Sequence, residues 1–263
     1  MAKMIFLKQC PGWLLAACVF LISVFAVSLS NAGVTDDLAP CVVYLQQDVP
    51  EGQDANIGSG FLVRSGNAAY LVTAAHVARA VGKRIRIVMP GADGKPVRAS
   101  LVGAAWRESS QADAAVNRLN IEESHREMIL DRCAPIALFS SRELPPSRDI
   151  PLTVMGYPLG LGADGYVSPL SIETRAASGF ITMRRFDNNQ FATFIILQDP
   201  SVGGLSGGPV FDTGKGYFAG GRKMITREGV SIVGLIHGVI FDKTGGKFTA
   251  VVPSTEIVRL IGE

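Results

Sequence analysis

The sequence has few charged residues and no spacing of cysteines or histidines typical of a metal site. Beyond its first 32 residues, it has no excess of positive or negative charge. Charged residues make up 18% of the 263 positions, below the roughly 25% of an average soluble protein. Apart from Lys3 and Lys8 near the N-terminus, basic and acidic residues are equal in number, so we expect no nucleic-acid partner. No Cys-x-x-Cys or His-x-x-x-His occurs, so we expect no metal and no other cofactor.

Helical periodicity is also scarce in this chain. Short runs rich in Val, Ile, Thr and Phe are separated by turn residues, of which 29 are glycine and 14 proline. This pattern favours an all-β barrel or sandwich, and the absence of helical segments between the strands excludes a parallel α/β sheet. We expect residues 120–132 to be a surface loop or short helix, and residues 255–261, after Ser254, to be a short terminal helix.

Residues 1–32 have the pattern of a signal peptide. Lys3 and Lys8 precede an apolar run over residues 13–29, and residues 30–32 (Ser-Asn-Ala) supply small side chains for cleavage after Ala32. We therefore expect a periplasmic or secreted protein without stable membrane insertion once the leader is removed. If the leader is retained, its apolar run of about 17 residues, at the short limit for a span, would serve as a membrane anchor.

The segment with the clearest chemical content is residues 204–209 (Gly-Leu-Ser-Gly-Gly-Pro). A serine hydroxyl is a poor nucleophile that needs a neighbouring base and donors for the oxyanion. Glycines allow a strained turn that aims the backbone N–H groups of Gly204 and Ser206 at one point. The segment alone also fits a plain β-turn, or the Gly-x-Ser-x-Gly elbow of an esterase with the α/β-hydrolase fold.

The order of the other candidate residues separates these alternatives. The base must be one of three histidines, His76, His125 or His237. His76 follows an apolar strand, and Asp113 leads into another. The order His, Asp, Ser is that of the chymotrypsin fold, whereas α/β-hydrolases have Ser, acid, His. The order and the missing helices therefore argue against an esterase, and His125, in a polar stretch, is expected to be solvated.

With these motifs, the chain resembles trypsin-like serine peptidases of the chymotrypsin fold, nearest the HtrA-like bacterial branch. The matching segments, in order, are Gly58–Phe61, Thr73–Val77, Asp113–Val116, Gly156–Gly160, Ser178–Ile181, Gly204–Pro209 and Phe248–Ser254. The resemblance covers nearly all of residues 41–262. It implies two antiparallel six-stranded Greek-key β-barrels and a short C-terminal helix. Residues 33–140 would carry His76 and Asp113, and residues 141–263 would carry Ser206.

The resemblance also implies a role for each residue in an endopeptidase acting on polypeptides. Ser206 would attack the scissile carbonyl and form an acyl-enzyme, His76 would take its proton, and Asp113 would orient the imidazole. The N–H groups of Gly204 and Ser206 would bind the oxyanion. Activity is expected to rise with pH through about 6.5–7, because His76 must be neutral to act as a base.

Two features depart from the family pattern. The residue before the nucleophile is usually Asp or Asn and is here Leu205, so an ion pair with a newly cut N-terminus cannot order the loop. A catalytically silent fold that acts as a binding module therefore stays open as an alternative. HtrA-like proteins usually carry PDZ domains after the peptidase, and no such segment is recognised here.

The expected substrate pocket is less well defined. Its candidate residues are Pro200, Ser201, Ile236, His237 and Gly238. Where trypsin has an acidic residue at the base of the pocket, this chain has Pro200, so we expect small or medium apolar side chains rather than Lys or Arg before the cut. His237 stands one position later than the glutamate-binding histidine of glutamyl endopeptidases. Either it packs near Asp113, or it shapes the pocket.

Two cysteines, Cys41 and Cys133, remain after the leader. Some chymotrypsin-fold peptidases tie an N-terminal segment to the connector between the barrels, and this resemblance implies a Cys41–Cys133 disulfide in an exported chain. The alternative is two separate buried thiols. Arg184 and Arg185 are expected on the solvated face of a hairpin whose turn is residues 187–189.

Overall fold

The computed structural model describes residues 33–91, 93–139, 144–215, 217–219, 223–225 and 229–262. The predicted leader and its cleavage site lie outside these residues. The described chain begins with the short helix α2 (Val34–Leu38), and the residues from Leu38 onward form one compact unit. Within the described residues, no helix has the length and apolar character needed to cross a membrane.

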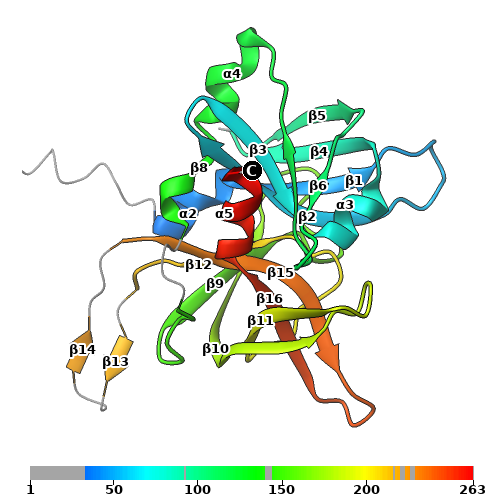
Figure 1. Cartoon of the computed structure of the whole chain (residues 1–263). Helices are drawn as coiled ribbons and strands as arrows, with labels where there is room; N and C mark the ends of the chain where they lie inside the picture. The colour runs from blue at the N-terminus through cyan, green and yellow to red at the C-terminus, as the bar shows by residue number, and fades with distance from the viewer. Residues whose placement is uncertain are drawn as a thin grey trace, which may run out of the picture. The chain divides into compact units, whose positions relative to one another are not determined.

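The first half of this unit is an eight-stranded sheet (Figure 1). Its strands are β1 (Val42–Gln47), β2 (Ile57–Ser65), β3 (Ala68–Thr73), β4 (Arg84–Pro90), β5 (Pro96–Val102), β6 (Arg107–Glu108), β7 (Ala115–Arg118) and β8 (Ala134–Pro135). The strand order is β5-β4-β1-β2-β3-β7-β6, and β8 pairs with β2. The run β4-β1-β2-β3 is a Greek key. The two-residue strands β6 and β8 raise the number of strands above the six predicted.

The second half is a closed six-stranded barrel with the order β10-β11-β16-β15-β12-β9. Its strands are β9 (Pro151–Gly156), β10 (Leu170–Arg184), β11 (Phe191–Leu197), β12 (Pro209–Asp212), β15 (Ser231–Phe241) and β16 (Lys247–Pro253). The run β12-β9-β10-β11 is again a Greek key. A separate ribbon pairs β13 (Tyr217–Ala219) with β14 (Lys223–Ile225). The prediction of an antiparallel, two-barrel-like β fold is confirmed.

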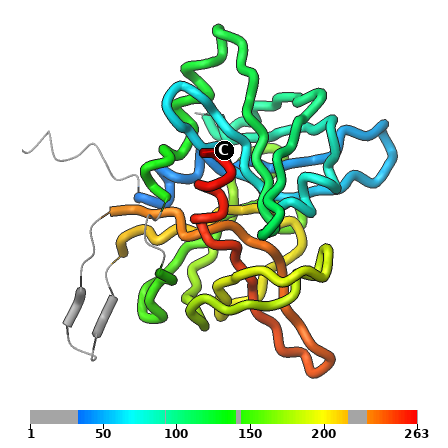
Figure 2. The backbone as a smooth tube through the Cα atoms, viewed as in Figure 1, coloured from blue at the N-terminus to red at the C-terminus, as the bar shows by residue number. Residues whose placement is uncertain are grey.

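The helices are short. Besides α2 they are η1 (Ala39–Cys41), α3 (Ala75–Val81), α4 (Glu123–Leu130), η2 (Ile136–Leu138), η3 (Pro158–Gly160) and α5 (Ser254–Gly262). The helices α4 and α5 fall where the sequence predicted them, whereas α3 was not predicted. Figure 2 shows the C-terminal segment returning to the first sheet, where the Arg107 guanidinium donates to the Leu260 carbonyl and Ser109 donates to Glu256.

Side-chain periodicity explains the strands that surround the site. In β4, Ile85 and Ile87 are buried while Arg84 and Arg86 are exposed, the alternation of a strand with one face on the core. Strand β15 is buried over most of its length because it pairs on both edges within the barrel wall and α5 packs against it. The hairpin β10–β11 turns through Asn189, which adopts a left-handed conformation (φ 61°) that asparagine tolerates.

Cys41 and Cys133 are free thiols, which corrects the predicted disulfide. Both lie in the same apolar core: Cys41 is buried in η1, and the Cys133 thiol, near enough to interact with it electrostatically, donates to the Ile129 carbonyl at 3.2 Å after α4. Burial raises the pKa of each thiol to about 12. Because the thiolate is the reactive form, both groups are expected to be inert in the folded chain.

Candidate active site

Ser206 lies in the glycine-rich loop between β11 and β12, and the local packing requires its glycines. Gly204 and Gly207 have positive φ angles of 95° and 84°. A Cβ atom on Gly207 would lie 2.1 Å from Thr73 Oγ1 and 2.2 Å from the Ser59 carbonyl oxygen. The predicted strained turn is therefore present, and it is pressed against β2 and the end of β3.

Ser59 of β2 holds this nucleophile loop (residues 203–207) at two points. Its backbone N–H donates to the Ser206 carbonyl at 3.0 Å. Its hydroxyl donates to the Gly204 carbonyl at 2.7 Å and accepts from the Tyr157 N–H at 2.8 Å. Ser59 is completely buried and its bond with the Tyr157 N–H is also buried, so water competes little with this anchor.

The same loop is oriented by η3 and by an apolar anchor. The Leu159 N–H donates to the Gly203 carbonyl at 2.7 Å. Since C=O and N–H point in opposite directions across a trans peptide, this bond turns the Gly204 N–H to the other side. Neither the Gly204 nor the Ser206 N–H donates to another group in the described part of the chain. Leu205 is 1% exposed and packs inside the barrel, so apolar packing replaces the family's usual acidic residue here.

His76 and Asp113 are brought together by α3 and the loop before β7. The His76 Nδ1 lies 2.6 Å from Asp113 Oδ2, and the His76 backbone N–H donates to Asp113 Oδ1 at 2.9 Å. Asp113 is fully buried. Burial raises its pKa, but the hydrogen bonds from His237 and His76 outweigh that effect and hold the pKa of Asp113 well below its ordinary range. The carboxylate is therefore ionised at neutral pH.

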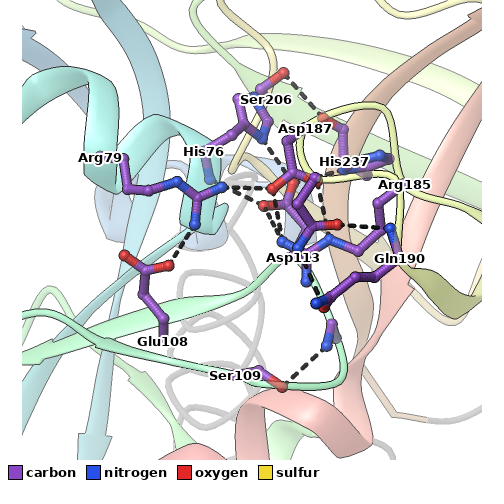
Figure 3. A network of polar contacts seen from close by, with 12 residues as sticks. His76, Arg79, Glu108, Ser109, Asp113, Arg185, Asp187, Gln190, Ser206 and His237 are labelled. Atoms are coloured by element: carbon purple, nitrogen blue, oxygen red, sulfur yellow. Dashed lines mark hydrogen bonds and ion pairs between the residues drawn. The ribbon is translucent and has the colours of Figure 1, made fainter.

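The Ser206 hydroxyl makes a different contact. Its Oγ donates to the His237 backbone carbonyl at 3.2 Å (Figure 3), and Ser206 and His76, both described, share no hydrogen bond. The structure thus brings two of the three predicted catalytic residues, His76 and Asp113, into contact, and the hydroxyl of the third is hydrogen-bonded to the His237 carbonyl instead of to His76.

The structure also joins Asp113 to His237, which is one of the two placements predicted for His237, and to Arg185, which was predicted on a solvated face. His237 Nδ1 lies 2.5 Å from Asp113 Oδ2, and Arg185 Nη2 lies 3.4 Å from Asp113 Oδ1 (Figure 3). Arg185 also binds Asp187 through two bonds of 2.9 and 2.7 Å, and Asp187 contacts Arg79 at 2.5 Å. Arg185 is 3% exposed, which corrects its predicted place on a solvated face.

Two histidines around one carboxylate can also form a metal site, but the distances between their atoms argue against a metal ion here. His76, Asp113 and His237 are the one group of three possible ligands found among the described residues. Ligand atoms around a tetrahedral zinc ion lie about 3.3 Å apart, given bonds of about 2.0–2.1 Å. The N–O distances of 2.5 and 2.6 Å are those of hydrogen bonds, so no ion fits between these atoms.

Three of the predicted substrate-binding residues share a small cavity. Pro200, Ser201 and Ile236 line it together with Leu205 and Thr249, and its volume is about 10 Å³. That volume corresponds to about one water molecule. The other two predicted residues lie elsewhere: His237 is buried against Asp113, and Gly238 is covered by the Phe186 ring, 2.7 Å from the position of a Cβ atom.

Comparison with known proteins gives a consistent picture. The model of the trypsin-like peptidase domain matches residues 58–220, and no curated protein matches the sequence. The active form of the Rv3671c protease from M. tuberculosis has a TM-score of 0.56 at 20% identity, covering 89% of this chain and 85% of that one.

Two further solved structures have a similar fold. The serine endoprotease from Yersinia pestis has a TM-score of 0.55 at 16% identity, covering 87% of this chain and 64% of that one. The HtrA-type protease AlgW, solved with a decapeptide, has a TM-score of 0.56 at 17% identity, covering 89% and 66%. Since the family model spans more than half of the sequence, this chain belongs to the trypsin-like peptidase family.

Proposed function

We propose that this chain is a serine endopeptidase that cleaves polypeptides through an acyl-enzyme. Ser206 is the nucleophile, His76 the general base and then the general acid, and Asp113 the carboxylate that orients His76. The N–H groups of Gly204 and Ser206 bind the oxyanion of the tetrahedral intermediate.

One observation carries this proposal: a buried, ionised Asp113 accepts hydrogen bonds from both the ring and the backbone N–H of His76. The bond to Nδ1 fixes the tautomer in which Nε2 is free to accept a proton. A buried carboxylate committed to a partly exposed imidazole is the arrangement that a general base requires.

The preference for small or medium apolar residues before the cut is supported by the sequence, because Pro200 stands where trypsin has an acidic residue. The cavity beside Pro200 holds only about 10 Å³ and also has Asp199 in its lining, so it must widen to admit any side chain and does not itself select among them. Cleavage-site profiling on a denatured proteome tests this preference, with Ser206→Ala as the control. Cuts mainly after Lys or Arg would contradict it.

The proposal includes export. Its support is the pattern of residues 1–32, with two lysines before an apolar run and small residues at the predicted cleavage site. The test is the N-terminal sequence of the protein recovered from its producing cells. An N-terminus at Gly33 in the exported fraction is expected, and an intact leader in the membrane fraction would contradict cleavage.

The contact between Ser206 and the His237 carbonyl favours one alternative, a silent fold that binds polypeptides without cleaving them. Hydrolysis of a denatured polypeptide separates the two functions. The proposed peptidase cleaves it in the presence of EDTA, and Ser206→Ala lowers the rate by several orders of magnitude. Binding without cleavage, or equal cleavage by Ser206→Ala, would support the alternative or another site.

A further inference from the structure

His237 is a buried histidine that the proposed chemistry leaves without a role. Its side chain is 1% exposed. Its ring stacks on Phe186, with centroids 4.1 Å apart and an angle of 26°, and lies 4.9 Å from the Phe194 ring. Burying a polar ring between aromatic side chains is unfavourable unless its nitrogens have hydrogen-bond partners. The hydrogen-bond partner of the His237 ring therefore indicates the role of this residue.

That partner is the carboxylate that holds His76. Oδ2 of Asp113 lies 2.5 Å from Nδ1 of His237 and 2.6 Å from Nδ1 of His76. The two imidazole rings are 5.9 Å apart and nearly perpendicular, at 85°. The other oxygen, Oδ1, accepts from the His76 backbone N–H at 2.9 Å and from Arg185 at 3.4 Å. Figure 3 shows these donors converging on Asp113 from both halves of the fold.

The hydrogen bonds determine which nitrogen of His237 carries the proton. An ionised carboxylate only accepts, so both Nδ1 atoms must donate to Oδ2. Among the described residues, Nε2 of His237 is a buried atom without a partner. A proton on Nε2 would be an unpaired buried donor, so the geometry favours the tautomer with the proton on Nδ1 alone.

The backbone of β15 explains how a histidine reaches this position. The pairing of β15 with β16 shifts between Ile236 and Gly238, a bulge that inserts His237 as an extra residue. A bulge re-aims the side chain that it carries. The backbone carbonyl of the same residue accepts from Ser206 Oγ, so His237 contacts the two ends of the proposed triad.

We propose that His237 is a positioning residue that holds the Asp113 carboxylate toward His76 and shares its negative charge. The inference rests on the proposed function, because the reaction it assists is that of Ser206 and His76. The charged groups nearest the three residues are Arg185, Asp187 and Arg79, and they are unchanged in the variants below.

The test compares His237→Phe, which keeps an aromatic ring and removes the donor, with His237→Asn, which keeps an N–H at the δ position. In His237→Phe we expect kcat to fall roughly 10-fold to 100-fold, as for loss of one hydrogen bond to a charged group, with little change in KM. The acid limb of the rate profile should move to higher pH, because the carboxylate then acts more strongly on protonated His76.

His237→Asn should restore most of kcat and the wild-type pH profile. Replacing the exposed His125, whose ring lies beside Ser124 and Glu122 at the start of α4, should change neither. If both His237 variants lower thermal stability but leave kcat and the pH profile unchanged, His237 has a packing role only and the proposal is wrong.

NMR of Ser206→Ala tests the hydrogen bonds without any need for hydrolysis. We expect two strongly downfield imidazole N–H protons, one from His76 and one from His237. Adding His237→Phe should remove one, and Asp113→Asn should remove both. A single such proton in Ser206→Ala overturns the proposal even if the enzyme is active. If both protons are present but the wild-type chain hydrolyses no polypeptide, the hydrogen bonds exist and the proposed function is wrong. The positioning role is then wrong as well, because it depends on that function.

Discussion

At the scale of single residues, Asp113 links folding to chemistry. Its carboxylate has a pKa below the ordinary range, because hydrogen bonds from two histidines outweigh the effect of burial. A group with a depressed folded pKa contributes stability above its unfolded pKa, about 3.9 for Asp, and loses it as pH falls through the folded pKa. The fold is therefore expected to weaken in acid through the same residue that orients His76.

This gives a prediction for stability against pH. The melting temperature of the wild-type chain should fall steeply below about pH 4, whereas that of Asp113→Asn should depend less on pH in that range. Thermal denaturation followed by circular dichroism between about pH 2 and pH 7 measures both curves. Parallel curves for the two proteins would show that Asp113 does not carry this dependence.

The sequence predicted those site residues whose neighbours along the chain form a recognisable motif. Ser206 stands among glycines, and His76 and Asp113 each border an apolar strand. For His237 the sequence left two placements open, one of them beside Asp113, and for Arg185 it gave no sign of its partner; Asp113 is 124 and 72 positions away from them along the chain. Arg185 was expected on a solvated face because it follows Arg184, but one residue at the end of a strand is enough to turn a side chain to the other face.

At the scale of elements, the nucleophile loop depends on a side chain from another sheet. Ser59→Ala removes the hydroxyl that joins the Gly204 carbonyl to the Tyr157 N–H. It should destabilise the chain by about 1–3 kcal/mol, since the buried Tyr157 N–H and the partly buried Gly204 carbonyl lose their partner. It should also lower kcat, because the loop that carries Ser206 loosens.

A matched control for this prediction is Ser178→Ala. Ser178 Oγ accepts from the Ile196 N–H at 3.0 Å, far along the chain from the loop, so its loss should lower stability without lowering kcat. Urea denaturation and steady-state kinetics on both variants make the comparison. Equal kcat values for the two variants would mean that Ser59 does not order the loop.

The hairpin β10–β11 brings a buried ion pair to the site. Asp187→Ala leaves the guanidinium of Arg185 without its two-bond partner, and breaking a buried pair in this way should cost about 3–5 kcal/mol. Asp164→Ala, which removes an exposed partner of Arg98, should have no measurable effect. Urea denaturation of the two variants measures both effects, and equal midpoints would contradict a structural role for the Arg185–Asp187 pair.

Elements with a regular pattern were predictable, and short or fully buried ones were not. Strand β4 alternates buried and exposed residues and was found from its sequence. Helix α3 has only seven residues, fewer than the window in which helical periodicity can be recognised, and all four residues of β12 are buried, so β12 shows no alternation. The first half of β10, residues 170–176, does alternate, but a bulge between Ala176 and Phe180 breaks the pattern before the second half.

At the scale of the whole molecule, stability rests on packing rather than on a covalent crosslink. Cys41 and Cys133 are buried free thiols, so a reducing agent should leave the melting temperature of residues 33–263 unchanged. An Ellman assay should detect two thiols per chain under denaturing, non-reducing conditions, and almost none in the folded chain because burial raises both pKa values. Absence of thiols after denaturation would contradict the structure.

The two Greek keys explain why the order of motifs predicted the fold although the residue contacts were not predicted. Each half places strands from distant positions side by side, and the site forms where loops from both halves meet at Asp113. The resemblance to trypsin-like peptidases supplied that topology. The network of His237, Arg185 and Asp187 depends on side chains particular to this sequence, so the sequence predicted only one part of it, as one of the two placements of His237 beside Asp113.

The most direct test of the central claim, that Ser206 is an activated nucleophile, is the rate of labelling by a fluorophosphonate. Such reagents react quickly only with a serine whose hydroxyl is activated by a base. The account predicts one label per chain, located on Ser206 by mass spectrometry, with greatly slowed labelling in His76→Ala and none in Ser206→Ala. Failure of the folded wild-type chain to react, or reaction at another residue, would contradict it.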